Sequence, residues 1–505
     1  MEKYGAKREK IFHLLEEAPD LKPASLKHIS EETGVPEADI YGTARFYDLL
    51  IRKGPRVCQG LTCKMEGSDA LHAELEKSSG ESHHAVSCLG QCDRAPVSIN
   101  ANMSLEACKP RGGVTPNNPD LPMNLAGVDS TSYEALEIAR SKGPEWVVDE
   151  LKTAELQGRG GAGFPAHFKW NAVRNERPGV RYVVCNADEA EPGTFKDREV
   201  MLRRPHLVVE GLAIAAITVG ATEVYVYVRG EFPAEIASLR KALDEASHHL
   251  DGLTFHLIPG HGAYICGEET ALLESIEGRR GMPRLKPPFP TQAGLWGKPT
   301  LMNNVETLAC VPDILIRGGK RFKEFGRTEP GSKLYCVSGH VGRPGVYELP
   351  LGVSLDEVVE AAGGYVGTPV AFSPGGASSG FLPISERGRP LDFRGLPEVG
   401  SMLGSAGVVV LNDTIDMAEA AYWQTIFFED ESCGQCAPCR IGTRYVQRAV
   451  ASFLEKGDPE VLKHIGDVGW EMEEGSICGL GIAAPLALTS AMKFFPDAFK
   501  KRTDS

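Results

Sequence analysis

The segment YVVCNADEAEPG, residues 182–193, predicts the fold of the central part of the chain. Its first four residues are apolar and indicate a buried strand, and an acidic cluster follows directly. A second buried strand is predicted over 224–228, and the apolar segment 207–219 between the two predicts a buried helix. This alternation is typical of an α/β domain, in which ligands bind outside the carboxyl ends of the strands. The acidic cluster is therefore a candidate binding site, and solvated loop charges are the alternative.

A glycine-rich string, GRGGAGF, occupies residues 158–164. A G-x-G-x-x-G string indicates a dinucleotide site only when a strand precedes it, whereas residues 145–156 predict a helix. The string is thus either a plain glycine-rich turn or a loop that offers N–H groups to a phosphate, with Arg159 and Lys169 adding positive charge. A second acidic run, over 264–270, is open to the same two interpretations as the first.

Three cysteines near the C-terminus, in ESCGQCAPCR (431–440), have C-x2-C-x2-C spacing. This spacing lets one loop hold three corners of an iron–sulfur cube. Cys478 is the one cysteine further along the sequence and is the candidate fourth ligand. We therefore expect a [4Fe–4S] cluster on Cys433, Cys436, Cys439 and Cys478. Zinc is the alternative metal, although it favours two separate C-x2-C knuckles, and a group without metal is the remaining alternative.

A second cysteine group lies near the N-terminus and consists of Cys58, Cys63, Cys88 and Cys92. Four thiolates in two pairs suit a [2Fe–2S] cluster, and the spacings fit neither zinc knuckles nor a thioredoxin C-x-x-C motif. A degenerate or empty site is the alternative. The other five cysteines are scattered, and we expect them to be small buried apolar residues: Cys108, Cys185, Cys266, Cys310 and Cys336.

Length and charge limit the classes of protein. The chain has 505 residues and a formal net charge of −14, which predicts several domains and argues against a sequence-independent nucleic-acid binder. It opens on a charged segment, residues 1–4, without the apolar core of a signal peptide. We therefore expect a cytoplasmic protein without a membrane span. In that reducing compartment, clustered cysteines indicate metal or redox chemistry rather than disulfides.

Several motifs together resemble one family. The flavoprotein that oxidises NADH in respiratory complex I is similar over about 130–500, in GRGGAGF with Lys169-Trp170, NADEAEPGTFKDR (186–198), GAYICGEETAL (262–272), RLKPPFP (284–290), MNNVETL (302–308) and ESCGQCAPCR. The [2Fe–2S] partner subunit of that enzyme is similar to the N-terminal part, in Phe46-Tyr47, CQGLTC (58–63) and SCLGQCDRAPVSIN (87–100). This fusion resembles the diaphorase subunits of NAD-dependent formate dehydrogenases and NAD-reducing hydrogenases. Chain length and the sequence ICGLG around Cys478 most resemble the formate dehydrogenase β subunit.

The resemblance implies an α/β multidomain fold. The implied parts are an N-terminal helical lead (1–53), a thioredoxin-like [2Fe–2S] ferredoxin domain (54–110), a linker (111–129), a Rossmann-like FMN and NAD(H) domain (130–328), a β-grasp domain (329–414) and a C-terminal helical bundle with the [4Fe–4S] cluster (415–505). The matching FMN positions are Gly158, Arg159, Gly160, Lys169, Asn186, Asp188, Glu189, Tyr264, Gly267, Glu268, Asn303 and Asn304. The matching NAD positions are Phe164, Glu191, Glu269, Lys286 and Phe289.

The implied activity is electron transfer between NAD(H), FMN and the two clusters, with no catalytic side chain because hydride transfer needs none. The implied partners are a second small [2Fe–2S] subunit and a large molybdenum formate dehydrogenase subunit, or a hydrogenase module. A complex I or hydrogenase diaphorase, a flavin-free iron–sulfur subunit and a zinc-bearing interaction protein are the alternatives.

Two departures from the family pattern affect these expectations. The gap of 24 residues between Cys63 and Cys88 is shorter than usual, which bears on the geometry of that cluster. Ala172 stands where an aromatic or large apolar residue usually helps to sandwich the adenine. Adenine stacking is then expected to rest on Phe164 and Phe289.

Overall fold

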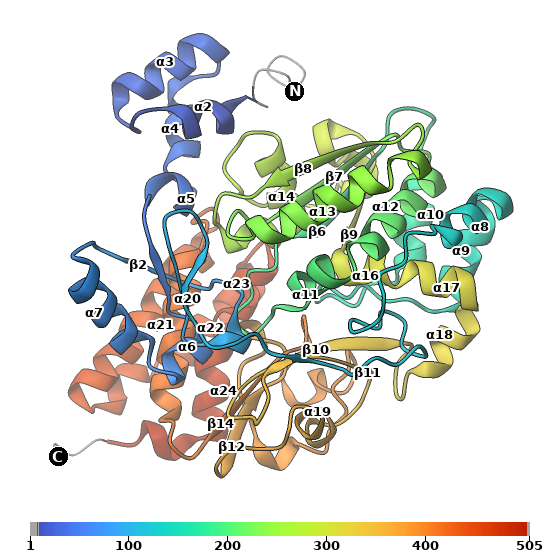
Figure 1. The fold of residues 1–505 in the computed structure, drawn as a ribbon. Coiled ribbons are helices and arrows are strands. Elements are labelled where there is room, and N and C mark those ends of the chain that lie inside the picture. The colour runs from blue at the N-terminus through green and yellow to red at the C-terminus, as the bar shows by residue number, and fades with distance from the viewer. Residues whose placement is uncertain (1–7, 9, 502–505) are drawn as a thin grey trace.

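The computed structural model describes residue 8 and residues 10–501, and it contains three β-sheets flanked by helices (Figure 1). The charged segment noted at the N-terminus, residues 1–4, lies outside the described residues. The predicted α/β multidomain architecture is confirmed.

The N-terminal part is a group of short helices attached to the central α/β domain. Gly34 ends the second helix in the left-handed conformation, with φ of 67°, as expected where a helix stops. The backbone N–H groups of Asp48 and Leu49 donate to the carbonyls of Gly262 and His261 at 3.0 and 2.9 Å. These hydrogen bonds attach the N-terminal helices to the α/β domain. The helices are α2 (Ile11–Glu17), α3 (Pro23–Thr33), α4 (Glu37–Ala44) and α5 (Asp48–Ile51).

The first sheet has four strands in the order β2-β1-β3-β4 and carries the N-terminal cysteine group. Strands β1 and β2 are parallel and the other neighbours are antiparallel. Helix α6 contacts α20 of the C-terminal helices, so this sheet lies beside the end of the chain (Figure 1). The elements are β1 (Arg56–Cys58), α6 (Leu61–Met65), α7 (Ser68–Ser79), β2 (His84–Val86), the 3₁₀ turn η2 (Cys92–Arg94), β3 (Ser98–Ile99) and β4 (Leu105–Ala107).

The central sheet has four parallel strands in the order β8-β7-β6-β9. Asn186 at the end of β6 is in register with Asn304 at the end of β9, so their polar ends share one edge. The strands are β6 (Tyr182–Ala187), β7 (Glu223–Val228), β8 (Thr254–Pro259) and β9 (Thr300–Asn304). The helices are α8 (Glu134–Lys142), α9 (Pro144–Thr153), α10 (Ala166–Arg174), α11 (Lys196–Arg203), α12 (Pro205–Val219), α13 (Pro233–Glu245), α14 (Glu269–Ile276), α15 (Pro290–Ala293), α16 (Val305–Ala309), α17 (Val311–Arg317) and α18 (Gly319–Phe325).

Both faces of the central sheet are buried, as its near-continuous apolar strands require. Val183 and Cys185 pack into the large core shared with α12, whereas Val184 packs into a second core with the N-terminal helices. Helix α12 is buried over most of its length, and a side chain at Gly211 would come within 2.2 Å of the carbonyl oxygen of Leu308. A glycine is therefore required for the close approach of α12 and α16.

The remaining sheet is mixed, with six strands in the order β13-β12-β14-β10-β11-β5. Strand β5 (Gly113–Val114) comes from the predicted linker and pairs with β11, which ties the linker to this sheet. The domain boundaries themselves stay a prediction from the sequence. The other elements are β10 (Ser332–Gly339), β11 (Gly345–Pro350), α19 (Leu355–Ala361), β12 (Pro369–Ser373), β13 (Leu382–Pro383) and β14 (Gly407–Asn412).

The C-terminal part is helical and surrounds the second cysteine group. Asp416 caps the first of these helices by accepting from the backbone N–H groups of Ala418 and Glu419. Among the described residues, no helix is both long and apolar enough to cross a bilayer. The cytoplasmic location stays a prediction. The helices are α20 (Met417–Glu431), α21 (Ala437–Lys456), α22 (Ile465–Gly475), α23 (Gly479–Ala483) and α24 (Leu486–Phe494).

Candidate functional site

A pocket of about 710 Å³ opens where the carboxyl ends of β6 and β9 meet the glycine-rich loop, and we call it the glycine-loop pocket. Its volume lies in the range of cofactor sites. It gathers most of the residues predicted to bind FMN or NAD: Gly158, Gly160, Phe164, Lys169, Asn186, Gly267, Glu268, Glu269, Lys286, Phe289, Asn303 and Asn304. The wall is completed by Gly161, Ala162, Gly163, Phe168, Ala172, Pro290, Thr291, Met302 and Thr307.

The glycine loop follows helix α9 rather than a strand, as the sequence predicted. The N–H of Gly158 donates to the carbonyl of Phe164 at 2.8 Å and closes the loop on itself. A side chain at Gly160 would come within 3.1 Å of the Asn304 side chain, and Gly163 has φ of 64°. The conformation at Gly163 therefore favours glycine, a side chain at Gly160 would press against Asn304, and the loop brings bare backbone to the pocket.

Asparagine side chains at the strand ends are held by hydrogen bonds. Asn303 accepts from the indole N–H of Trp170 at 2.9 Å, and Asn186 donates to the carbonyl of Gly267 at 2.8 Å. Asn304 caps α16 by accepting from the N–H of Glu306. Their orientations are therefore set before a ligand enters, which is the preorganisation that a binding site needs.

The charged rim of the pocket is a set of ion pairs. Lys286 Nζ lies 2.9 Å from Glu268 and 3.2 Å from Glu269, and Lys169 Nζ lies 3.3 Å from Glu269. Although burial favours its neutral form, the two lysines hold the pKa of Glu269 below its usual value. The rim therefore presents two ammonium groups and two carboxylates, which can orient the polar groups of a nucleotide.

Exposed aromatic rings stand at the pocket. Phe164 and Phe289 are 50% and 52% exposed, and Phe168 is 59% exposed. Phe168 was missed by the sequence reasoning, yet it lies one turn before Ala172 on α10, and both residues line the pocket. The i, i+4 spacing is the signal that could have found it. An aromatic ring is therefore available on the face where Ala172 has none.

Some predicted FMN residues lie outside the pocket wall. Arg159 points away from it, because its Nη2 donates to the carbonyl of Pro330 at 2.8 Å. Glu189 accepts from the backbone N–H groups of Asp197 and Arg198 at 2.9 and 3.0 Å, and burial raises its pKa to about 7. These two residues therefore support the loops around the pocket rather than line it.

Asp188 and Tyr264, also predicted for FMN, line a second cavity of about 350 Å³, which also contacts Cys88 and Cys433. Glu191, predicted for NAD, accepts from the hydroxyl of Tyr264 and from the N–H of Ser378, the latter at 2.7 Å. The second cavity thus lies between residues of the two cysteine groups.

Three of the four C-terminal cysteines lie at helix starts, whereas Cys433 follows the end of α20. Cys436 precedes the first residue of α21, Cys439 lies in its first turn, and Cys478 precedes the first residue of α23. Helix N-termini favour negative charge, which suits thiolates and a cluster. Burial raises the pKa of Cys439 to about 12, and the charges of Cys433, Cys436 and Cys478 add to that rise. The four thiols therefore lie close enough to repel one another when ionised.

The N-terminal cysteines are buried and in mutual contact. Contact with the thiol of Cys63 is the largest influence raising the pKa of Cys58, and contact with Cys58 and burial raise the pKa of Cys88 to about 12. Contact with Cys88 likewise raises the pKa of Cys92. All four thiols are thus gathered despite the short gap between the pairs.

Each thiol group brings four sulfur ligands together, which is the number that an iron–sulfur cluster needs. Buried thiols with raised pKa values release protons when metal binds. The residues present therefore fit the predicted clusters.

The scattered cysteines are mostly as expected. Four of them, Cys185, Cys266, Cys310 and Cys336, are buried. The prediction is wrong for Cys108, which is exposed. Cys108 follows directly after β4, whose residues Leu105 and Glu106 are also exposed, so the chain here runs along the surface.

Comparisons with known protein families match four parts of the chain. Residues 151–313 match the Nuo51 FMN-binding domain, and 419–502 match the NADH-ubiquinone oxidoreductase-F iron-sulfur binding region. Residues 1–111 match the thioredoxin-like [2Fe-2S] ferredoxin family, and 334–382 match the SLBB domain. The resemblance inferred from the motifs is thereby confirmed, as are FMN and the two cluster types as cofactors.

Two relatives and one solved structure show the extent of the likeness. The NADH-quinone oxidoreductase F-subunit 2 of Rhizobium meliloti (strain 1021) is 46% identical over 388 residues, covering 73% of this chain and 91% of the relative. The corresponding F-subunit of Aquifex aeolicus (strain VF5) is 44% identical over 384 residues, covering 73% and 88%. A crystal structure of an NAD+-reducing [NiFe]-hydrogenase in the H2-reduced state matches with a TM-score of 0.91 at 28% identity, covering 99% of this chain and 94% of that one. The chain therefore belongs to the family of NADH-quinone oxidoreductase F-subunits, which are NADH dehydrogenase-type oxidoreductases.

Proposed function

We propose that the chain is the diaphorase subunit of an NAD-dependent formate dehydrogenase, passing electrons between NAD(H), FMN and its two clusters. Homologues named as subunits of NADH-quinone oxidoreductase support the NADH dehydrogenase activity. Formate as the electron source is supported by the resemblance of the ICGLG sequence around Cys478 to the formate dehydrogenase β subunit. A small [2Fe–2S] subunit and a large molybdenum subunit would complete such an enzyme.

The proposed FMN site uses the pocket residues on the glycine loop and at the strand ends. In this proposal, backbone N–H groups of the loop and Lys169 would bind the phosphate, and the asparagine amides would bind the edge of the ring. Phe164 and Phe289 would hold the adenine of NAD(H), and Glu269 and Lys286 would orient its polar groups. When bound, FMN accepts a hydride from NADH and releases the two electrons singly.

One observation carries this proposal: Tyr264 connects the predicted FMN residues to the C-terminal thiol group. Its backbone N–H donates to Glu431, two residues before Cys433, at 2.9 Å. It also lines the second cavity together with Asp188 and Cys433. This contact supports a flavin site next to the cube, as single-electron transfer requires.

The second candidate is the diaphorase subunit of an NAD-reducing hydrogenase. The match to the hydrogenase chain extends over 99% of this chain and so includes the N-terminal [2Fe–2S] part, whereas the F-subunit relatives cover 73%. The domain combination is thus common to this chain and that hydrogenase.

Co-purification from the native host tests both candidates. The expected result is a complex that contains molybdenum and reduces NAD+ with formate. Reduction of NAD+ with H2 and a nickel-bearing partner would identify the hydrogenase diaphorase instead. Purified protein without flavin and without NADH-dependent reduction of a dye would overturn the diaphorase function itself.

A further inference from the structure

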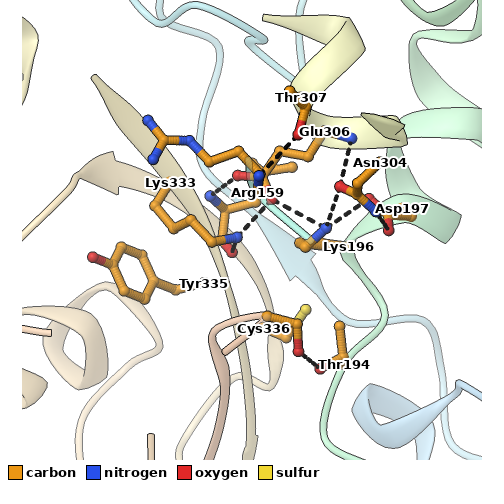
Figure 2. Close-up of polar contacts among 12 residues, drawn as sticks. Arg159, Thr194, Lys196, Asp197, Asn304, Glu306, Thr307, Lys333, Tyr335 and Cys336 are labelled. Atoms are coloured by element: carbon orange, nitrogen blue, oxygen red, sulfur yellow. Dashed lines mark hydrogen bonds and ion pairs between the residues drawn. The ribbon is translucent and has the colours of Figure 1, made fainter. Parts of the chain in front are cut away.

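A group of buried charged side chains contacts residues that line the glycine-loop pocket, and Figure 2 shows this group. Lys196, Glu306 and Lys333 have fully buried side chains, and that of Asp197 is 3% exposed. Lys333 belongs to β10 of the mixed sheet, whereas the other three belong to helices of the central α/β domain. The charges therefore join two parts of the molecule.

Glu306 is the centre of this group. Its Oε2 lies 2.5 Å from Lys333 Nζ and 3.1 Å from Lys196 Nζ, and its Oε1 accepts from the N–H of Leu334 at 2.9 Å. Although burial favours the neutral form, Lys333, Lys196 and Arg159 hold the pKa of Glu306 below its usual value. The β10 strand thus holds α16 through both oxygens of one carboxylate.

The same group reaches the pocket wall. Asn304, which lines the pocket, accepts from Lys196 at 3.1 Å and donates to Asp197 at 2.6 Å. Thr307, also in the wall, accepts from the backbone N–H of Arg159 in the glycine loop at 2.8 Å. Both wall residues flank Glu306 closely in the chain, so a shift of Glu306 would move them.

Stability alone does not account for these charges. A buried ion pair costs about as much in desolvation as it gains in attraction, so well-packed apolar residues in its place are often neutral or stabilising. Removing one partner is strongly unfavourable, because it leaves a buried charge unpaired. Such a pair does, however, fix the geometry of the groups that it joins.

We propose that Lys333 is a positioning residue for the flavin site, through which the mixed sheet fixes Glu306 and hence the pocket wall at Asn304 and Thr307. Lys333 pairs with Glu306 and does not line the pocket. The inference rests on the proposal that FMN occupies the glycine-loop pocket.

The test compares two variants on the same strand. Lys333→Met keeps an unbranched apolar side chain, one atom shorter than lysine, and removes its charge. Tyr335→Phe is the matched control, because it removes a buried hydrogen bond to the carbonyl of Leu391, at 3.0 Å, without touching Glu306. FMN is removed from the full chain and added back, and its Kd is measured from flavin fluorescence alongside the thermal midpoint. We expect Lys333→Met to raise the FMN Kd at least about tenfold, and Tyr335→Phe to lower the midpoint while changing the Kd less than about threefold.

Two results would overturn the inference: an unchanged FMN Kd in Lys333→Met, or an equal rise of the Kd in Tyr335→Phe, which would indicate a general effect of damaging β10. If Lys333→Met does not fold, Glu306→Gln tests the link from its other end, because the amide still accepts from Leu334 but loses the ion pairs with Lys333 and Lys196. The same two criteria then apply to it. A wild-type chain that binds no FMN would instead overturn the proposed function.

Discussion

Phe168 is the most exposed of the three aromatic rings at the glycine-loop pocket, with 59% of its surface accessible. Its ring centroid lies 6.3 Å from that of Phe164, which is within the range of interacting aromatic pairs. An exposed ring of this size adds nothing to the core, so its position is best explained by stacking on a ligand. We therefore expect Phe168 to take the part in adenine binding that Ala172 cannot.

The corresponding prediction is that Phe168→Ala raises the KM for NADH about fivefold and leaves kcat nearly unchanged, since one aromatic contact contributes about 1 kcal/mol. Steady-state dye reduction measures both constants. The control is Ile316→Ala, another exposed apolar residue, on α17 and outside the pocket. Equal KM values for wild type and Phe168→Ala would show that the ring does not contact the dinucleotide.

Cys478 tests the assignment of the cube, because it is the one ligand distant in sequence from the other three. Replacing it by serine is expected to lower the iron and acid-labile sulfide content by about four of each per chain, with flavin retained. Cys108→Ser is the control, since that thiol is exposed and belongs to neither group. Full iron content in Cys478→Ser would exclude Cys478 as a ligand.

At the scale of elements, α12 carries a glutamate in its buried length. Glu210 accepts a hydrogen bond from the N–H of Leu136, near the start of α8, at 3.0 Å. Burial raises the pKa of Glu210 to about 7, although this hydrogen bond lowers it. Below the usual value of 4.5 the carboxyl is protonated in both the folded and unfolded states. Between 4.5 and 7 only the folded state keeps the proton, so this contribution to stability is lost as pH rises.

We expect the unfolding midpoint of the wild type to fall between about pH 5 and about pH 8 by more than that of Glu210→Gln, whose amide stays neutral. The full contribution is on the order of 3 kcal/mol. Denaturant unfolding at the two pH values measures it, with the exposed Glu74→Gln on α7 as control. The same pH dependence in Glu210→Gln as in wild type would assign the slope to other groups.

Local patterns predicted much of the fold and the site. The strand at 182–185 with its polar end placed Asn186 at the pocket, and the cysteine spacings placed both thiol groups. Lys333 could not be predicted, because a lone lysine in a strand pattern usually indicates a solvent-facing position, and its partner Glu306 is distant in sequence. Strand β5 could not be predicted either, because two residues in a Pro- and Gly-rich stretch show no periodicity.

At the scale of the whole molecule, the loop from Cys88 to Asp93 joins the N-terminal sheet to the central domain. Arg229 donates to the carbonyl of Cys88 at 2.6 Å, and Arg198 donates to the carbonyl of Gly90 at 3.0 Å. A side chain at Gly90 would come within 2.6 Å of the Phe232 ring. The loop that carries two proposed cluster ligands is therefore held by another domain.

Arg198 tests the attachment of this loop to the central domain more directly than Arg229 does. It also pairs with Asp93 at 2.9 Å, and both side chains are nearly fully buried. We expect Arg198→Met to lower the free energy of unfolding by about 3–5 kcal/mol, since it leaves Asp93 unpaired in the interior. It should also release about two irons per chain while the C-terminal cube stays.

Arg203→Met is the control: its pair with Glu199 is partly exposed, and its loss should cost about 0.5 kcal/mol without loss of iron. If Arg198→Met kept both its iron and its stability, the N-terminal cluster would not depend on the central domain, and the fusion of the two parts would serve only to keep them together.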